Sequence, residues 1–295
     1  MQESFRSGYV SIIGRPNVGK STLLNALIGQ KVSIVAARPQ TTRNRILGVR
    51  NLPGAQIIFI DTPGIHRPKN LLGEVMVRSV GEVLQEIDII LFVAEPGVNA
   101  GRDNIIVESL KNSAKPVFLL INKIDSVRKP EILHIIDQYK GLLPFKEIIP
   151  VSALKKDGTD MVLERILQYL PAGPQYYPED IVTDQVERFM AAEIIREKIM
   201  EKTTEEIPYS VAVEVQGWSE RQDGVVSISA NIYVEREGQK GIIIGEKGRK
   251  LKEVGTLARI EIEKLLGAKV FLQLWVKVKK GWRDDKKVLN ELGYK

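Results

Sequence analysis

Short apolar runs alternate with longer amphipathic segments over the first 170 residues. Four apolar runs rich in β-branched residues predict buried strands, at 9–13, 56–60, 89–93 and 117–121. Between them, helical spacing of apolar residues predicts helices at 21–28, 71–85, 104–112, 131–140 and 160–169. Strands that alternate with helices predict a doubly wound α/β domain, with a mostly parallel sheet and helices on both faces.

A proline-rich segment at 171–178 interrupts this pattern, and its three prolines cannot sustain a helix or a central strand. We therefore expect a first domain over 1–171, a linker over 172–182 and a second domain over 183–295. The elements expected in the second domain are a helix, two strands, two helices and a strand, at 184–201, 209–215, 225–234, 240–245, 249–265 and 269–278. This order predicts a small α+β domain. The charged residues from Trp282 onward are expected to be loosely held.

Composition excludes several kinds of site. The 295 residues contain no cysteine, which excludes disulfides, thiolate metal sites and cysteine nucleophiles. Only His66 and His134 could supply imidazole, so histidine-rich metal sites are disfavoured. No apolar run approaches the roughly 18 residues of a membrane span. Together these features predict a cytosolic protein.

Charge is distributed unevenly over the second domain. Residues 181–237 carry 6 Lys and Arg against 12 Asp and Glu, a net −6, whereas residues 238–295 carry 15 against 7, a net +8. A basic half of this kind suits a polyanionic partner, but an ordinary solvated surface gives the same count. The charge alone leaves both interpretations open.

The clearest motif is Gly14-Arg-Pro-Asn-Val-Gly-Lys-Ser21, which fits the phosphate-binding pattern G-x-x-x-x-G-K-[ST] between a strand and a helix. Backbone N–H groups and the helix N-terminus attract phosphate oxygens there. Lys20 is expected to reach the β- and γ-phosphates, and Ser21 to hold Mg²⁺. The expected phosphate-binding residues are Gly14, Arg15, Pro16, Asn17, Val18, Gly19, Lys20, Ser21 and Thr22.

A second motif, Asp61-Thr62-Pro63-Gly64, follows the strand at 56–60. A carboxylate at the C-terminal end of such a strand lies on the ligand-binding edge of the sheet, so Asp61 is a candidate Mg²⁺ ligand. Gly64 allows its backbone to approach the γ-phosphate.

The base is expected to be guanine. The strand at 117–121 ends in Asn122-Lys123-Ile-Asp125, and a carboxylate can accept from both N1–H and N2–H₂ of guanine, a pair that adenine lacks. Asp125 is therefore the expected specificity residue, with Asn122 bracing its loop and the stem of Lys123 covering the base. A further strand is expected at 148–151, and a backbone N–H in Ser152-Ala153-Leu154 after it is expected to reach guanine O6.

In this order the motifs resemble those of the translation-factor-related GTPases. The resemblance implies that Thr42, or alternatively Thr41, completes the Mg²⁺ shell with Ser21 and Asp61 in a segment ordered by GTP. Ile65 stands where many such proteins have a water-orienting glutamine, so intrinsic hydrolysis should be slow. Asn17 resembles the residue of GTPases that coordinate K⁺. Surface or RNA-facing roles are favoured for Arg43 and Arg45 over arginine fingers. The groups expected to act on the γ-phosphate are Lys20, Thr42, Gly64 and Asn17.

The second domain contains G-x-x-G between two predicted helices, the setting of a KH domain whose loop clamps single-stranded RNA. Its glycines permit close approach to the sugar-phosphate backbone, and its cations supply counter-charge. Three isoleucines are expected to form the groove floor. The expected RNA-binding residues are Ile242, Ile243, Ile244, Gly245, Glu246, Lys247, Gly248, Arg249 and Lys250. Trp275 suits a core position and a stacking platform equally, next to Lys277 and Lys279.

The whole motif order resembles the Era family of ribosome-assembly GTPases, through GRPNVGKST, QTTRNR, DTPG, NKID, SAL and GIIIGEKGRKL. The resemblance implies a P-loop GTPase domain followed by a type II KH domain, with GTP or GDP, Mg²⁺ and K⁺ as ligands. It also implies binding to the 3′ end of 16S rRNA in the small ribosomal subunit, and a cytoplasmic, partly membrane-associated location. No DNA partner is expected. Three alternatives remain: a signalling GTPase whose second domain binds protein or membrane, an RNA-binding module with a merely structural nucleotide, and an ATPase.

Overall fold

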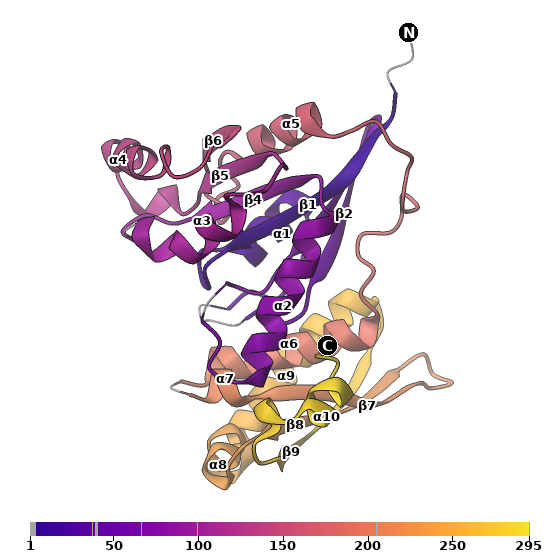
Figure 1. Cartoon of the computed structure of the whole chain (residues 1–295). Coiled ribbons are helices and arrows are strands. Elements are labelled where there is room, and N and C mark those ends of the chain that lie inside the picture. The colour runs from indigo at the N-terminus through magenta and orange to yellow at the C-terminus, as the bar shows by residue number, and fades with distance from the viewer. Residues whose placement is uncertain are drawn as a thin grey trace. The chain divides into compact units, whose positions relative to one another are not determined.

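A computed structural model of the chain describes residues 4–36, 38, 41–65, 67–98, 100–204 and 206–294 (Figure 1). Contacts divide the chain into two compact units. The first consists of residues 1–33, 42–68 and 76–184. The second consists of residues 34–41, 69–75 and 185–295.

The first unit is built on a six-stranded sheet with strand order β2-β3-β1-β4-β5-β6. The strands are β1 (Arg6–Gly14), β2 (Ile46–Leu52), β3 (Ala55–Asp61), β4 (Ile89–Ala94), β5 (Val117–Ile121) and β6 (Glu147–Pro150). Only the β2–β3 pair is antiparallel. Every residue of β3, β4 and β5 is buried, which explains why their sequences are almost continuously apolar.

Helices cover this sheet as the sequence predicts. They are α1 (Lys20–Ile28), α2 (Leu71–Glu86), α3 (Asn104–Leu110), α4 (Lys129–Tyr139) and α5 (Thr159–Tyr169). One core cluster joins Phe92 of β4 to Val83, Val107 and Ile135 of α2, α3 and α4, whereas α1 contacts α5. The α/β fold class is confirmed, and the antiparallel strand β2 is the element that the sequence analysis missed.

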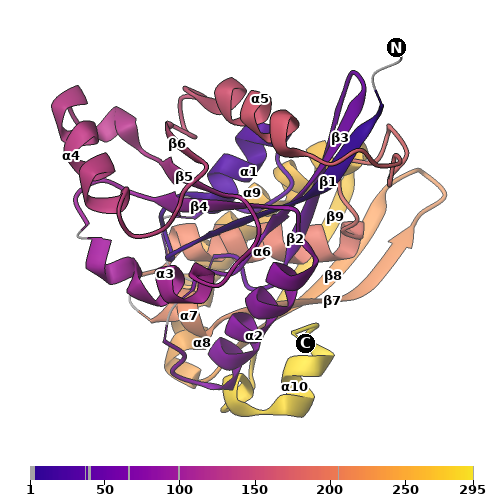
Figure 2. The ribbon, with the colours of Figure 1, turned by 45° about the horizontal axis from the view of Figure 1, so that its top comes forward.

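The second unit contains a three-stranded sheet in the order β7-β8-β9, seen from another angle in Figure 2. Strands β7 (Ala212–Glu220) and β8 (Val226–Val234) are antiparallel, and β9 (Val270–Val278) pairs parallel to β8. The predicted order of elements is confirmed, with two added short helices. The helices are α6 (Glu187–Lys202), α7 (Ile207–Ser210), α8 (Glu237–Ile244), α9 (Arg249–Leu266) and α10 (Lys286–Glu291).

The C-terminal residues are well packed, so the expectation that they are loosely held is wrong. The Trp282 side chain is fully buried, and its Nε1 donates to the carbonyl oxygen of Ser210 at 3.0 Å. Its ring stacks on Tyr294 with centroids 6.1 Å apart. Charge dominates this segment in sequence, but two aromatic rings anchor it in the second unit.

Candidate functional site

The predicted phosphate loop joins the end of β1 to the start of α1. Gly19 has a φ of 95°, in the left-handed region that glycine adopts without strain. The backbone of the Asp61 motif lies against this loop: the N–H of Ile65 donates to the Gly14 carbonyl at 3.2 Å. A Cβ on Gly64 would stand 2.6 Å from the nitrogen of Pro16, so only glycine fits there. The lack of a side chain at Gly64 therefore allows its backbone to pack against Pro16 of the phosphate loop.

Lys20 lies on the inner side of this loop. Its side chain is buried, and Nζ donates to the carbonyl oxygens of Gly14 at 3.1 Å and Arg15 at 2.9 Å. Burial lowers the pKa of Lys20 to about 8, although the nearby Asp61 carboxylate opposes this effect. A phosphate bound at the loop would pair its negative charge with the Lys20 ammonium group.

Asp61 is the centre of a buried cluster of hydroxyl groups. Its Oδ2 accepts from Ser21 at 2.7 Å, from Thr42 at 3.2 Å and from Ser33 at 3.3 Å. Burial raises the pKa of the Asp61 carboxyl, and these hydroxyls together with Lys20 oppose the rise. Among the described residues, Oδ1 has no hydrogen-bond partner although it is buried. A buried oxygen of this kind beside three hydroxyls fits the oxygen-ligand preference of Mg²⁺.

The structure distinguishes between the two candidate threonines. The hydroxyls of Thr42 and Ser21 are 2.8 Å apart, so Thr42 belongs to the Asp61 cluster. The hydroxyl of Thr41 instead donates to the carbonyl oxygens of Ala36 at 3.2 Å and Arg38 at 2.6 Å.

Arg43 and Arg45, which follow these threonines, differ in exposure. Arg45 is exposed, as a surface role requires. Arg43 is 2% exposed, so the surface or RNA-facing role favoured for it is wrong.

The predicted base-binding loops are joined through Asn122. Its Nδ2 donates to the carbonyl of Val18 at 2.8 Å, and its Oδ1 accepts from the N–H of Ala153 at 2.9 Å. One amide therefore ties the phosphate loop to the loop after β6, which is the bracing role expected for it. Asp125 is exposed, and its Oδ1 accepts from the Ser152 hydroxyl at 2.5 Å.

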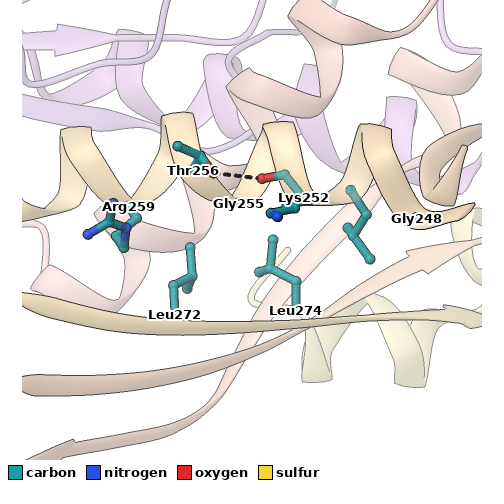
Figure 3. A pocket seen from close by; sticks show the side chains of 8 residues that line it. Gly248, Lys252, Gly255, Thr256, Arg259, Leu272 and Leu274 are labelled. Carbon is teal, nitrogen blue, oxygen red and sulfur yellow. Dashed lines mark hydrogen bonds between the residues drawn. The ribbon is translucent and has the colours of Figure 1, made fainter.

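The second unit contains a cavity of about 380 Å³ between α9 and β9 (Figure 3). Leu272 and Leu274 of β9 point toward the helix, which faces them with Lys252 and Arg259. Its lining residues are Gly248, Leu251, Lys252, Gly255, Thr256, Arg259, Leu272 and Leu274. The result is a groove with an apolar floor and basic groups at the helix side, and only Gly248 of this set was expected from the sequence.

The G-x-x-G turn lies at one end of this groove, between α8 and α9. Gly245, Lys247 and Gly248 have φ values of 69°, 51° and 78°, which explains the two glycines. Ile243 is fully buried in the domain core, so its side chain does not form a groove floor as expected. Ile242 is 42% exposed on α8.

Both parts of the chain match known protein families. A family model described as 50S ribosome-binding GTPase matches residues 9–123, and a KH domain model matches residues 206–283. GTPase Era of Ruminiclostridium cellulolyticum is 52% identical over 293 residues, with 99% of this chain and 98% of the relative covered. GTPase Era of Geobacter metallireducens is 54% identical over 292 residues, with 98% of each covered. The chain belongs to the GTPase Era family.

Two solved Era structures have the same fold over 98% of this chain and 99% of theirs. A variant of Aquifex aeolicus Era bound to GDP·AlF₄⁻ has a TM-score of 0.95 and 46% identity. An Era complex with MgGDPNP and nucleotides 1506–1542 of 16S ribosomal RNA has a TM-score of 0.96 and 45% identity. As a member of the Era family, the chain is a GTPase with a C-terminal KH domain.

One polar network of this Era-family chain was not predicted from the sequence. Arg15 donates from Nε to Oδ1 of Asp103 at 2.8 Å, and the Tyr139 hydroxyl donates to Oδ2 at 2.5 Å. Lys123 donates to the Asn17 carbonyl at 2.6 Å and pairs with Glu95 at 2.5 Å. Both sets of contacts include a residue of the phosphate loop, Arg15 in the first and Asn17 in the second. Nothing in the local pattern signals Asp103, because it follows a loop that carries no motif.

The remaining expected residues lie along the same loops. Val18 is fully buried, Leu154 is 72% exposed, and the Thr62 hydroxyl donates to the Ile12 carbonyl at 2.9 Å. Arg249 pairs with Glu246 at the start of α9. His66 lies outside the described residues.

Proposed function

We propose that this chain is a switch that hydrolyses GTP slowly in the presence of Mg²⁺ and binds single-stranded RNA through its KH groove. The RNA is the 3′ end of small-subunit rRNA, and the process is maturation of the small ribosomal subunit. The observation that carries the proposal is the pairing, in one chain, of the Asp61 cluster with the basic groove of α9 and β9. The Era complex that holds both MgGDPNP and 16S rRNA supports it.

At the nucleotide site, Lys20 and the N-terminus of α1 hold the β- and γ-phosphates, and Asp125 selects guanine. Ser21, Thr42 and Asp61 are the residues that hold Mg²⁺, which when bound neutralises charge on the phosphates. The backbone of Gly64 faces the γ-phosphate. Ile65 is an apolar residue that cannot orient water, so hydrolysis is slow.

We propose K⁺ as a second ion, near Asn17. This residue is exposed in the phosphate loop and has a φ of 67°, in the left-handed region. A cation there supplies charge stabilisation that an arginine finger provides in other GTPases. Hydrolysis is then expected to be faster in KCl than in NaCl at equal ionic strength.

The RNA groove combines features that suit unpaired bases. Leu272 and Leu274 give the bases an apolar surface, and Lys252 and Arg259 lie on the facing helix to meet phosphates (Figure 3). The G-x-x-G turn at residues 245–248 allows the sugar-phosphate backbone to approach closely.

The coupling between nucleotide and RNA is proposed to run through the segment before Thr42. Residues 34–41 belong to the second unit, where the N–H of Val35 donates to Oε1 of Glu197 on α6 at 2.7 Å. In the same unit, Arg196 of α6 donates to the carbonyl of Thr41. A γ-phosphate that orders Thr42 therefore constrains a segment whose other contacts are made with the RNA-binding unit.

We further propose a cytoplasmic location with peripheral contact at the inner face of the membrane. Across the described ranges, no helix has the length and apolarity that a membrane span requires. The net charge of +6 suits attraction to anionic lipids as well as to RNA.

The proposal is tested by titrating fluorescent 3′-terminal 16S rRNA with the protein loaded with a non-hydrolysable GTP analogue or with GDP. We expect different affinities in the two states, and a K252E/R259E variant should lose RNA binding while it retains nucleotide. Equal affinities would refute the switch, since a ligand without differential affinity shifts no equilibrium. Binding to anionic vesicles but not to RNA would favour a signalling GTPase, and a preference for ATP would indicate an ATPase.

A further inference from the structure

Strand β9 presents two chemically different faces. Leu272 and Leu274 point toward α9 and line the RNA groove (Figure 3). Because side chains alternate along a strand, the odd-numbered residues lie on the opposite face of the sheet. From one end to the other these are Lys269, Phe271, Gln273, Trp275, Lys277 and Lys279. None of them is acidic, and two large aromatic rings stand between the cations.

The two rings are both partly exposed to solvent. Phe271 is 43% exposed and Trp275 is 45% exposed, whereas the helix-facing Val270 and Val276 are buried. Trp275 is therefore not a core residue. The register pairs these rings with Ser227 and Asn231 of β8, whose short polar side chains do not cover them.

The charged group that contacts the Phe271 ring is positive. The guanidinium of Arg221 lies 4.6 Å from the centroid of the Phe271 ring. Across the described part of the chain, neither Arg221 nor Lys277 forms an ion pair. Two acidic groups lie on the same face and have partners: Glu291 pairs with Lys279 at 3.1 Å, and Glu214, which is in register with Asn231 and Trp275, accepts from the Tyr233 hydroxyl at 3.0 Å.

We propose that this surface, made of Arg221, Phe271, Gln273, Trp275 and Lys277 and here named the outer β9 face, is a second binding site for single-stranded RNA. Bases stack on the two rings, the amide of Gln273 bonds to base edges, and the cations meet phosphates. The proposal rests on the proposed RNA-binding function and extends it beyond the groove.

Two features favour RNA over a protein as the occupant. Protein interfaces are depleted of charge at their centre, whereas here the Arg221 cation contacts the Phe271 ring and Lys277 follows Trp275 on the same face. In addition, β9 is an edge strand, and no strand among the described residues pairs with it on the side away from β8. An RNA strand that leaves the groove beside Leu272 and Leu274 can pass around this edge to Phe271 and Trp275 on the other face.

The test compares a 5-nucleotide and a 12-nucleotide unstructured RNA by fluorescence anisotropy, using full-length protein. The shorter RNA fills the groove, because a KH loop clamps four nucleotides. For F271A/W275A we expect affinity for the 12-mer to fall at least tenfold, because both stacking surfaces are lost, and affinity for the 5-mer to stay within twofold. The matched control is L265A, which removes a side chain that is 41% exposed on α9.

A second readout follows Trp275 directly. In a W218F background, the remaining tryptophans are Trp275 and the fully buried Trp282, so quenching by the 12-mer and not by the 5-mer reports stacking at Trp275. Unchanged 12-mer affinity in F271A/W275A together with absent quenching would overturn the second site. Loss of binding to small-subunit particles with RNA affinity intact would also overturn it, in favour of a protein contact. Failure of the unmodified protein to bind either RNA would instead refute the proposed function.

Discussion

The side chain of Arg15 lies against the fully buried carboxylate of Asp103, with Nε 2.8 Å from Oδ1. The Tyr139 hydroxyl donates to the other oxygen, Oδ2 of Asp103. Burial and this hydrogen bond raise the pKa of the Tyr139 hydroxyl. A buried carboxylate is tolerated only when it is paired, so Asp103 depends on both partners. Since Arg15 is part of the phosphate loop, the pair also fixes the backbone that faces the nucleotide.

We therefore expect D103N to destabilise the fold by about 2 kcal/mol, because Arg15 loses a charged hydrogen-bond partner and keeps only the longer contact with Glu95 at 3.7 Å. Y139F removes one hydrogen bond and should cost about 1 kcal/mol. Urea unfolding measures both. D103N should also weaken GDP binding in calorimetry, whereas Y139F should not; equal stability of D103N and the unmodified protein would contradict this account.

The second prediction concerns base selection. Replacing Asp125 by asparagine should lower GTP affinity at least about hundredfold, because guanine N1–H and N2–H₂ lose their shared acceptor. The amide can donate to the C2 carbonyl of xanthine, so affinity for xanthosine triphosphate should rise. S152A is the matched control: it removes only the hydroxyl that donates to Asp125, and should change GTP affinity by less than about tenfold. Competition binding with the two nucleotides measures the exchange of specificity.

Local patterns in the sequence were sufficient to predict many elements of this fold. Continuous apolar runs predict β3, β4 and β5 because both faces of these strands are buried. The resemblance to known GTPases favoured Thr42 over Thr41, and Thr42 is the one in the Asp61 cluster. The groove residues Lys252 and Arg259 were missed because helical periodicity shows which residues face the core, and not which of the others line a cavity.

Other features depend on partners that are distant in sequence. Asp103 meets Arg15 from 88 residues away, and Trp282 meets Ser210 from 72 residues away. From the sequence, a core position and a surface position were equally possible for Trp275. The register with β8 and its 45% exposure show which face of the sheet it occupies. Ile243 was assigned to the groove because the apolar run before Gly245 does not reveal which of its members turns inward.

The third prediction is a pH dependence at Lys20. Burial lowers the pKa of its side chain from 10.5 to about 8. Between these values the unfolded chain binds more protons than the folded one, so the stability of the nucleotide-free protein should rise with pH. Phosphate binding needs the charged form, so GDP affinity should fall up to tenfold per pH unit above about 8. Calorimetry at pH 8.5 in two buffers should show proton uptake, and K20R should show none because its guanidinium stays charged.

The last prediction separates two adjacent threonines. Thr42 shares the Asp61 cluster with Ser21, whereas the Thr41 hydroxyl is bonded to the carbonyls of Ala36 and Arg38. T42A should lower the rate of GTP hydrolysis about a hundredfold, the scale of losing one group that stabilises transition-state charge. Its GDP affinity should be unchanged, because the segment that contains Thr42 is ordered by the γ-phosphate. T41A should hydrolyse GTP within about threefold of the unmodified rate, since it loses hydrogen bonds within its own loop only. Single-turnover hydrolysis with saturating Mg²⁺ measures the rates of both variants. An equal loss of rate in T42A and T41A would contradict the assignment of Thr42 as the threonine that completes the Mg²⁺ shell.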